Sequence, residues 1–195
     1  MRRAFEFLLV GSVAATLTGC LTLMPVSSHV QRGVDFAHYT TYDWGPADAR
    51  PVTDERLREN PYFVDDVHGA IDTELNRHAL VRAATERADL LVHYHAAIAA
   101  RVEVASRPGS YRDCLGDNCQ PQVNTYDAGT LVIDIVDAST RELVWRGWAE
   151  HRLEDMLDDP VQVRRRVQDA VRRIFDTFPL TVNPTSRRTA LEGTR

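Results

Sequence analysis

The stretch Gly129–His151, GTLVIDIVDASTRELVWRGWAEH, decides the fold of this chain. It contains two runs in which apolar side chains recur at every second position, and both runs are rich in β-branched and aromatic residues. Period two with these residue types indicates β-strands. The segment Asp137–Glu142 between the runs is polar and contains turn-forming residues, so the pattern predicts one antiparallel hairpin.

One face of this hairpin is predicted to belong to the core. Gly147 and Ala149 on this face are small, which would let a helix lie close against the second strand. The residues assigned to the face are Leu131, Ile133, Ile135, Leu143, Trp145, Gly147 and Ala149.

Two further strands are predicted upstream of the hairpin. Val34–Trp44, VDFAHYTTYDW, has strong β propensity through its aromatic and threonine residues. Leu90–Val104 alternates apolar and mixed positions over a long run. The polar, proline-punctuated segment Ala47–Asn60 between them is predicted to be a loop.

Two helices are predicted from apolar residues spaced three and four apart, the mark of one buried stripe. The first begins near Pro61, and the second follows an N-cap at Asp159 and a proline at Pro160. Arginines line the other side of the second helix, and a solvated face is the usual meaning of that pattern. The stripes are Val64, Val67, Ile71 and Leu75 in the first helix and Val163, Val167, Ala170, Val171, Ile174, Phe175 and Phe178 in the second.

The predicted order is β-α-β-β-β-α. Because each helix has one apolar stripe, both helices should cover the same face of the sheet. We therefore predict an α+β two-layer sandwich, in which a mostly antiparallel sheet of about four strands carries two helices on one face.

The first residues have the features of a targeting segment. Arg2 and Arg3 precede the apolar run Phe7–Leu17, which is too short to span a bilayer, so residues 1–19 are predicted to be a signal peptide. The run that ends in Cys20, LTGC, resembles the lipobox of bacterial lipoproteins. That resemblance implies cleavage before Cys20, a diacylglyceryl group on its thiol and acylation of the new amine. We expect a mature protein that is attached to the membrane through this N-terminal lipid.

The segments that flank the domain are predicted to be flexible. Residues 20–33 contain proline and serine and are read as a lipidated tether, and the polar residues 179–195 are read as a disordered tail. The folded domain is therefore predicted over residues 34–178. Leu21, and not an aspartate, follows the cysteine. By resemblance to enterobacterial lipoprotein sorting, this implies the outer membrane, with the domain facing the periplasm.

Composition limits the class of protein and partner. The chain of 195 residues has 44% hydrophobic residues, enough for one domain with a core. Its formal net charge is −5, and this mildly acidic balance argues against nucleic acid as a partner.

Two cysteines remain once Cys20 is lipidated. Cys114 and Cys119 lie in the polar stretch Ser106–Tyr126, and an exported chain meets an oxidising compartment, so we expect them to form a disulfide. Four residues separate them and no helix signal follows the first, which is unlike a catalytic dithiol.

Three histidines are the candidates for a metal site. His93 and His95 would project side by side from one strand, and His151 at the end of the hairpin could add a third ligand. Zinc requires three or four ligands at fixed geometry, and no local spacing sets the position of His151. We therefore expect no metal and no cofactor, and read the pair as ordinary histidines on a partly solvated sheet face.

The segments VDFAHYTTYDW, ADLLVHYHA and GTLVIDIVDASTRELVWRGWAE, followed by the terminal amphipathic helix, resemble the DUF4136 family of bacterial lipoproteins. The resemblance covers about Val34 to Phe178 and is most specific in the hairpin, through Asp134, Asp137 and Trp145-Arg-Gly147. It implies an envelope location and the fold. The family is uncharacterised, so the resemblance implies no catalytic residues.

The expected function is a lipid-anchored envelope lipoprotein that acts as a non-enzymatic binding or assembly module, with a possible protein partner in the envelope. No nucleophile–base pair and no phosphate-binding loop is evident in the sequence, which favours this over an enzyme. The alternative is a metal-dependent hydrolase that uses His93, His95 and His151.

Overall fold

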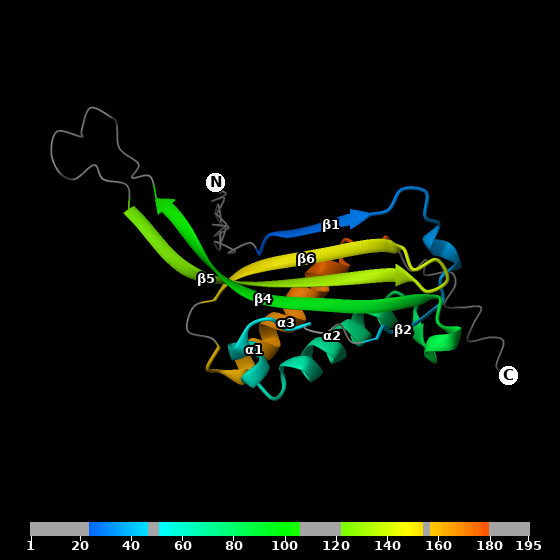
Figure 1. Cartoon of the computed structure of the whole chain (residues 1–195), viewed down its shortest axis with the longest axis horizontal. Helices are drawn as coiled ribbons and strands as arrows, with labels where there is room; N and C mark the ends of the chain where they lie inside the picture. Colours follow the sequence, from blue (N-terminus) through cyan, green and yellow to red (C-terminus); the bar gives the residue numbers. More distant parts are fainter. Residues whose placement is uncertain (1–23, 47–50, 106–121, 154–156, 180–195) are drawn as a thin grey trace, which may run out of the picture.

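The computed structural model describes residues 24–46, 51–105, 122–153 and 157–179 (Figure 1). The signal segment, Cys20, Cys114, Cys119 and the residues after 179 lie outside these ranges. The elements in chain order are β1 (Val26–Val30), a 3-10 turn (Phe36–His38), β2 (Thr41–Trp44), α1 (Glu55–Glu59), α2 (Phe63–Arg77), β3 (Val81–Arg82), a second 3-10 turn (Thr85–Arg87), β4 (Leu90–Ala105), β5 (Gln122–Asp137), β6 (Leu143–Leu153) and α3 (Pro160–Phe175).

The strands form one sheet in the order β1-β6-β5-β4-β2-β3. The neighbours from β1 to β4 are antiparallel, whereas β2 is parallel to both β4 and β3. Helices α2 and α3 pack beside each other on one side of this sheet (Figure 1). The α+β two-layer arrangement is thus as predicted, but the sheet has six strands and not about four. No helix within the described residues is both long and apolar enough to cross a membrane.

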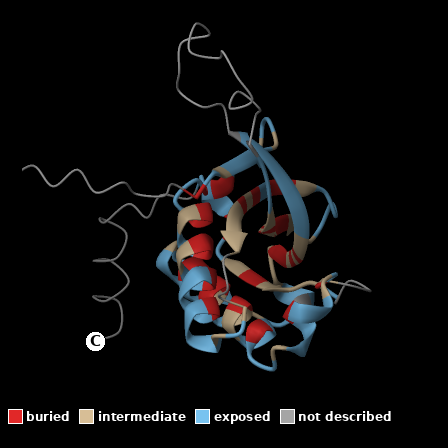
Figure 2. Ribbon diagram, turned by 90° about the vertical axis from the view of Figure 1, so that its left-hand side faces the viewer, coloured by how far each residue is buried: buried red, intermediate tan, exposed pale blue. Residues whose placement is uncertain are grey.

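The predicted hairpin is formed by β5 and β6. Ile133 pairs with Gly147 and Ile135 with Trp145, so the apolar alternations of the two strands coincide on one face. Trp145 is fully buried, and its ring lies tilted against the ring of Phe175 from α3, with 5.5 Å between the centroids. Buried residues occur on both the helices and the strands (Figure 2) and form one core cluster. The hairpin contributes the face that its sequence indicated, except at Leu143: the register shifts between Ile135 and Val136, and Val144 joins the core in its place.

Both predicted helices are present. In α3 the Asp159 side chain accepts hydrogen bonds from the backbone N–H groups of Val161 and Gln162, and Pro160 occupies the first turn. Every residue of the stripe predicted for α3 and its C-terminal continuation is buried. In α2 the prediction was wrong at Val64, which is exposed, because Phe63 and Ala70 complete the buried stripe instead.

The segment predicted to be a flexible tether contains a strand. Val26–Val30 is β1 and pairs antiparallel with β6, with Val26 opposite Ala149. Four of its side chains, Ser27, Ser28, His29 and Val30, are exposed. The strand is held at the sheet edge by backbone hydrogen bonds, which need no alternating apolar pattern, and this explains why its sequence did not predict it.

Two further predictions are corrected between β1 and α2. Only Thr41–Trp44 of the predicted strand Val34–Trp44 is β-structure. Upstream, Asp35 accepts a hydrogen bond from the Ala37 N–H and caps a 3-10 turn, which places Phe36 and Tyr39 together in the core. The segment Ala47–Asn60, predicted to be a loop, contains the short helix α1, which is capped in the same way by Asp54.

Candidate functional site

The sheet has one covered face and one open face, and the three candidate histidines divide between them. The register places His93 opposite Asp134 and His95 opposite Val132, on the face away from the helices. His151 pairs with Gly129 and continues the alternation of Trp145, Gly147 and Ala149 on the helix-covered face. The three histidines therefore do not converge. Within the described part of the chain, no group of three or more His, Cys, Asp or Glu side chains could hold a metal ion.

The two histidines of the open face each lie beside a protein neighbour that explains their position. The His93 ring lies against the backbone of Gly45, where an added Cβ would come within 2.2 Å of the ring. His95 Nε2 lies 3.9 Å from Asp134 Oδ2. Asp134 is almost fully buried and accepts two hydrogen bonds from the Arg146 guanidinium, at 2.6 and 2.7 Å. This bidentate pair satisfies the carboxylate without a metal ion.

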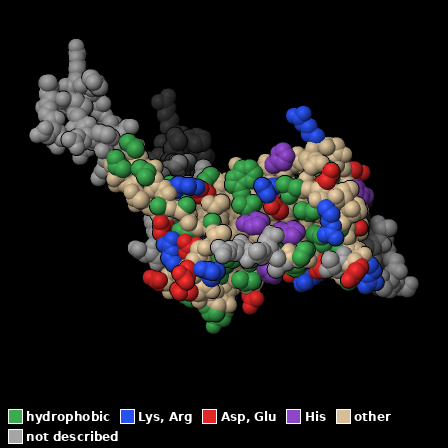
Figure 3. Space-filling view, viewed as in Figure 1, with side chains coloured by type: hydrophobic (Ala, Val, Ile, Leu, Met, Phe, Trp, Pro, Cys, Tyr) green, Lys and Arg blue, Asp and Glu red, His purple; other side chains and the backbone are tan. Residues whose placement is uncertain are grey.

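Two further ion pairs lie on the open face, and each joins β4 to β6. Arg101 donates to Glu150 at 2.7 Å, and this hydrogen bond lowers the pKa of the Glu150 carboxyl. Arg152 pairs with Glu103 and lies 3.7 Å above the ring of Tyr126. Basic and acidic side chains and histidines are interspersed on the surface seen in Figure 3. Because both signs occur side by side and several of the charges are paired, the described residues of this face form no patch of one sign for a charged ligand.

An apolar pocket lies between the sheet and the helices on the other face. Its cavity volume is about 80 Å³, well below the 300–1,000 Å³ typical of sites for drug-sized ligands. It is lined by Met24, Leu57, Phe63, Ala96, Ala97, Ile98, Gly129, Thr130, Leu131, Ala149, His151, Leu153, Leu157, Val163, Arg166, Val167 and Ala170.

Small residues on the strands create this pocket. Ala96, Gly129 and Ala149 form part of its lining, where larger side chains would fill the space under the helices. Leu153 closes one side, because its Cδ atoms lie only 3.2 Å from where a Cβ on Gly129 would be. The opposite side comes from α3 through Val163 and other members of its buried stripe.

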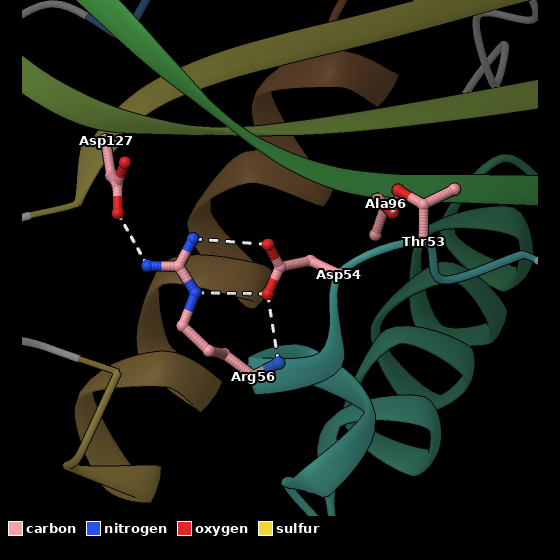
Figure 4. A network of polar contacts seen from close by, with 5 residues as sticks. All are labelled: Thr53, Asp54, Arg56, Ala96 and Asp127. Carbon is pink, nitrogen blue, oxygen red and sulfur yellow. Dashed lines mark hydrogen bonds and ion pairs between the residues drawn. The ribbon is translucent and has the colours of Figure 1, made fainter.

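Helix α1 supplies Leu57 to the pocket and is fixed by a polar network (Figure 4). The Arg56 side chain donates to Asp54 at 3.1 and 3.2 Å and to Asp127 of β5 at 2.5 Å. The hydrogen bond from Arg56 holds the pKa of Asp54 below its usual value. Just before the helix, the Thr53 N–H donates to the carbonyl of Ala96 at 3.1 Å. These contacts tie α1 to the two central strands, so the wall that it forms is preorganised.

The lining of the pocket contains few ionisable side chains. Arg166 and His151 are the pocket's ionisable side chains, and no carboxylate or thiol is among its described lining residues. The pocket can hold a slender apolar group, with the Arg166 cation available to an acidic group next to it.

Sequence reasoning identified some of these residues but not the pocket. Val163, Val167 and Ala170 were assigned to the buried stripe of α3, and Ala149 was recognised as a small residue under a helix. Phe63 was missed, although it precedes Val67 by one helical turn and the spacing could have revealed it. Met24 and Leu57 carry no local signal, because Met24 lies just before β1 and Leu57 lies in the short helix α1, neither of which the pattern predicted.

The sequence model for the DUF4136 family, a domain of unknown function, matches residues 26–180. The chain belongs to the DUF4136 family. The match begins at β1, inside the segment that was predicted to be a tether, and covers the described fold. A search among curated proteins found none with significant similarity to this DUF4136 chain.

Several solved structures align with this DUF4136 chain. A PDZ domain protein from Parabacteroides distasonis aligns with 16% identity and a TM-score of 0.51 over 81% of this chain, which spans only 36% of that protein's length. A PelC dodecamer from Paraburkholderia phytofirmans aligns with 11% identity and a TM-score of 0.42, covering 78% of this chain and 94% of its own. A putative neuraminyllactose-binding hemagglutinin homolog from Helicobacter pylori aligns with 9% identity and a TM-score of 0.40, covering 77% and 89%. At 16% identity, the likeness to the PDZ domain protein concerns the fold alone.

Proposed function

We propose that this protein is a lipid-anchored envelope lipoprotein without catalytic activity, which binds the end of an acyl chain in its apolar pocket. The observation that carries the proposal is the pocket between α1, α3 and the central strands, whose lining is almost wholly apolar. Its volume of about 80 Å³ is suited to a few methylene groups and excludes a bulky ligand.

The positive charge of Arg166 beside the pocket favours a ligand whose acyl chain carries an acidic head group. Arg166 is the one arginine among the described lining residues, and guanidinium binds carboxylate and phosphate in a bidentate way. A fatty acid or an acidic lipid would then place its chain against Ala149 and Leu131 and its head group near Arg166.

The expected lipid anchor would hold this pocket close to a membrane. Met24 lines the pocket and is four residues from Cys20, the cysteine of the predicted lipobox. The mature protein would then carry its lipid at Cys20, in the outer membrane and on the periplasmic side. A domain held next to a bilayer meets acyl chains at high local concentration.

Anchoring is tested by Cys20→Ser. The precursor should remain unprocessed at that position, or the protein should be released in soluble form. The measurement is membrane partitioning together with the mass of the N-terminal peptide. A variant that partitions and matures like the wild type would contradict the anchoring proposal.

Binding is tested on the soluble Cys20→Ser form with a long-chain fatty acid that carries a fluorescent polyene. Saturable binding is expected, and the added Ala149→Leu change should abolish it by filling the pocket. Ala99→Leu is the matched control, because Ala99 is exposed on the open face.

A second pair of variants keeps the test meaningful if Ala149→Leu impairs folding. Arg166→Gln should weaken binding of the fatty acid about tenfold through loss of a charge-assisted hydrogen bond. Arg165→Gln, which changes an exposed neighbour outside the described lining, should leave binding unchanged. Equal binding by all these variants would exclude this pocket as the site.

A further inference from the structure

Strands β4 and β5 extend beyond the rest of the sheet. They pair with each other from Leu90 opposite Asp137 to Ala105 opposite Gln122. Within the described residues, strand β6 accompanies β5 as far as Leu153, which lies opposite Asp127. Residues 101–105 and 122–126 therefore form a two-stranded ribbon that projects from the body, at the upper left of Figure 1. A ribbon of two strands buries little surface of its own and is stabilised only marginally in water.

One face of this ribbon is apolar and exposed. Val102 and Val104 are two residues apart on β4, and Val123 lies directly opposite Val104 on β5, so the three side chains share a face. They are 65%, 58% and 60% exposed, respectively. We call these three residues the valine face. Clustered apolar side chains at the surface are a sign of an interaction site.

The two faces of the ribbon differ in character. Arg101, Glu103 and Tyr126 lie on the face that continues the open side of the sheet, where they join the ion pairs with β6. The valine face instead continues the side that carries the helices and the pocket, in alternation with Tyr94 and Ala96. No helix among the described residues covers it, so the valine face is the exposed end of the core side.

The chain enters the domain at this same end. Glu150 donates its N–H to the Pro25 carbonyl at 3.2 Å, and Val26 pairs with Ala149, so β1 begins near the end of β6 at which the ribbon starts. Cys20 is four residues before Met24, and even a fully extended chain of four residues spans only about 14 Å. A lipid on Cys20 would therefore hold this end of the domain close to the bilayer.

We propose that the valine face lies against the surface of the lipid bilayer in which Cys20 is anchored. The inference rests on the anchoring in the proposed function and adds an orientation to it: the ribbon end faces the membrane, and β3 faces away. Contact with the bilayer removes the three valines from water, which the domain itself does not do. Arg101 of the ribbon and Arg152 of the neighbouring strand β6 are both paired with carboxylates, so the contact requires no anionic lipid.

The test places a fluorescent probe at single positions of the full-length lipidated protein. The background carries Cys114→Ser and Cys119→Ser, and the added changes are Val102→Cys, Val104→Cys or Val123→Cys. Val81→Cys is the matched control, because Val81 is a valine that is 61% exposed and lies in β3, at the Leu90 end of the sheet. Along β4 that end is about 45 Å from the valine face.

The proteins are reconstituted in uncharged vesicles of phosphatidylethanolamine and phosphatidylcholine, a fraction of which carries a nitroxide quencher on the acyl chain. The proposal expects a blue shift and loss of fluorescence at the three ribbon positions, unchanged by salt, and no loss at Val81→Cys. The combined changes Val102→Ser and Val104→Ser should reduce the quenching seen at Val123→Cys.

Other outcomes overturn the orientation and identify the reason. A mass showing lipid on Cys20, together with no quenching at the ribbon, would retain the anchor and reject the docking surface. Shielding that depends on protein concentration, or that is also present in detergent, would show that a second copy covers the valine face. A mature chain without lipid would reject both the anchoring and the orientation.

Discussion

Gly147 of β6 lies directly under Ile174 of α3. A Cβ added to Gly147 would come within 2.5 Å of Ile174 Cγ2 and within 2.5 and 2.6 Å of two ring carbons of Trp145. Both neighbours are fully buried and cannot withdraw into solvent. This glycine therefore sets how closely α3 approaches the sheet.

Gly147→Val should accordingly destabilise the domain. Overpacking of a closed core site of this kind costs about 1–3 kcal/mol. The free energy of unfolding from urea titration is the measurement, and an unchanged midpoint would contradict the packing described here.

Gly69→Ala is the opposite case and serves as its control. Gly69 lies in the interior of α2, is exposed, and has no heavy atom within 4 Å of the position of an added Cβ. Alanine should therefore raise the free energy of unfolding by up to about 1 kcal/mol, because it restricts the unfolded chain and favours the helix. A loss of stability on this change would show that α2 is packed on that side.

The raised pKa of Tyr39 should make the stability of the folded domain depend on pH in the alkaline range. Its hydroxyl donates to Asp137 Oδ2 at 2.8 Å, and burial together with this hydrogen bond raises the pKa of Tyr39 to about 12. The folded state thus favours the neutral phenol. The neutral phenol contributes its full share to the free energy of unfolding below the unfolded pKa of about 10. This contribution is lost as the pH rises from there towards 12.

Tyr39→Phe should remove that part of the alkaline sensitivity, which is of the order of 2 kcal/mol. The measurement is the free energy of unfolding at a series of pH values between neutral and alkaline, compared with the wild type. Curves that stay parallel throughout would mean that Tyr39 does not titrate with folding.

The combined changes His93→Ala and His95→Ala should alter stability modestly and metal content not at all. His93 packs against Gly45, and His95 lies near an Asp134 carboxylate that Arg146 already satisfies. Elemental analysis of protein purified without added metal is the measurement. Stoichiometric zinc that disappears in the double variant would revive the metal-dependent alternative.

Cys114 and Cys119 are expected to be bonded to each other in protein taken from the envelope. The expectation comes from the oxidising compartment that an exported chain meets, since both residues lie outside the described structure. Mass spectrometry after alkylation without reductant should show neither thiol modified. Two alkylated thiols would refute the disulfide.

The sequence alone determined the central hairpin, the α3 stripe and the core position of Trp145. These features rest on periodicity, because a strand or helix with one buried face must repeat its apolar side chains at the period of that element. The position of His151 could have been predicted in the same way. It continues the alternation of Trp145 and Gly147, which places it on the helix-covered face and apart from His93.

Only the tertiary structure decided the edge strand β1, the helix α1, the pocket and the projecting ribbon. Strand β1 is held by backbone pairing with β6, and α1 by the bridge from Arg56 to Asp127, so neither needs a periodic sequence. The pocket depends on which residues distant in sequence meet, such as Met24 and Leu153. The valine face follows from the different lengths of the paired strands β4, β5 and β6, and only their mutual register shows where one strand loses its neighbour.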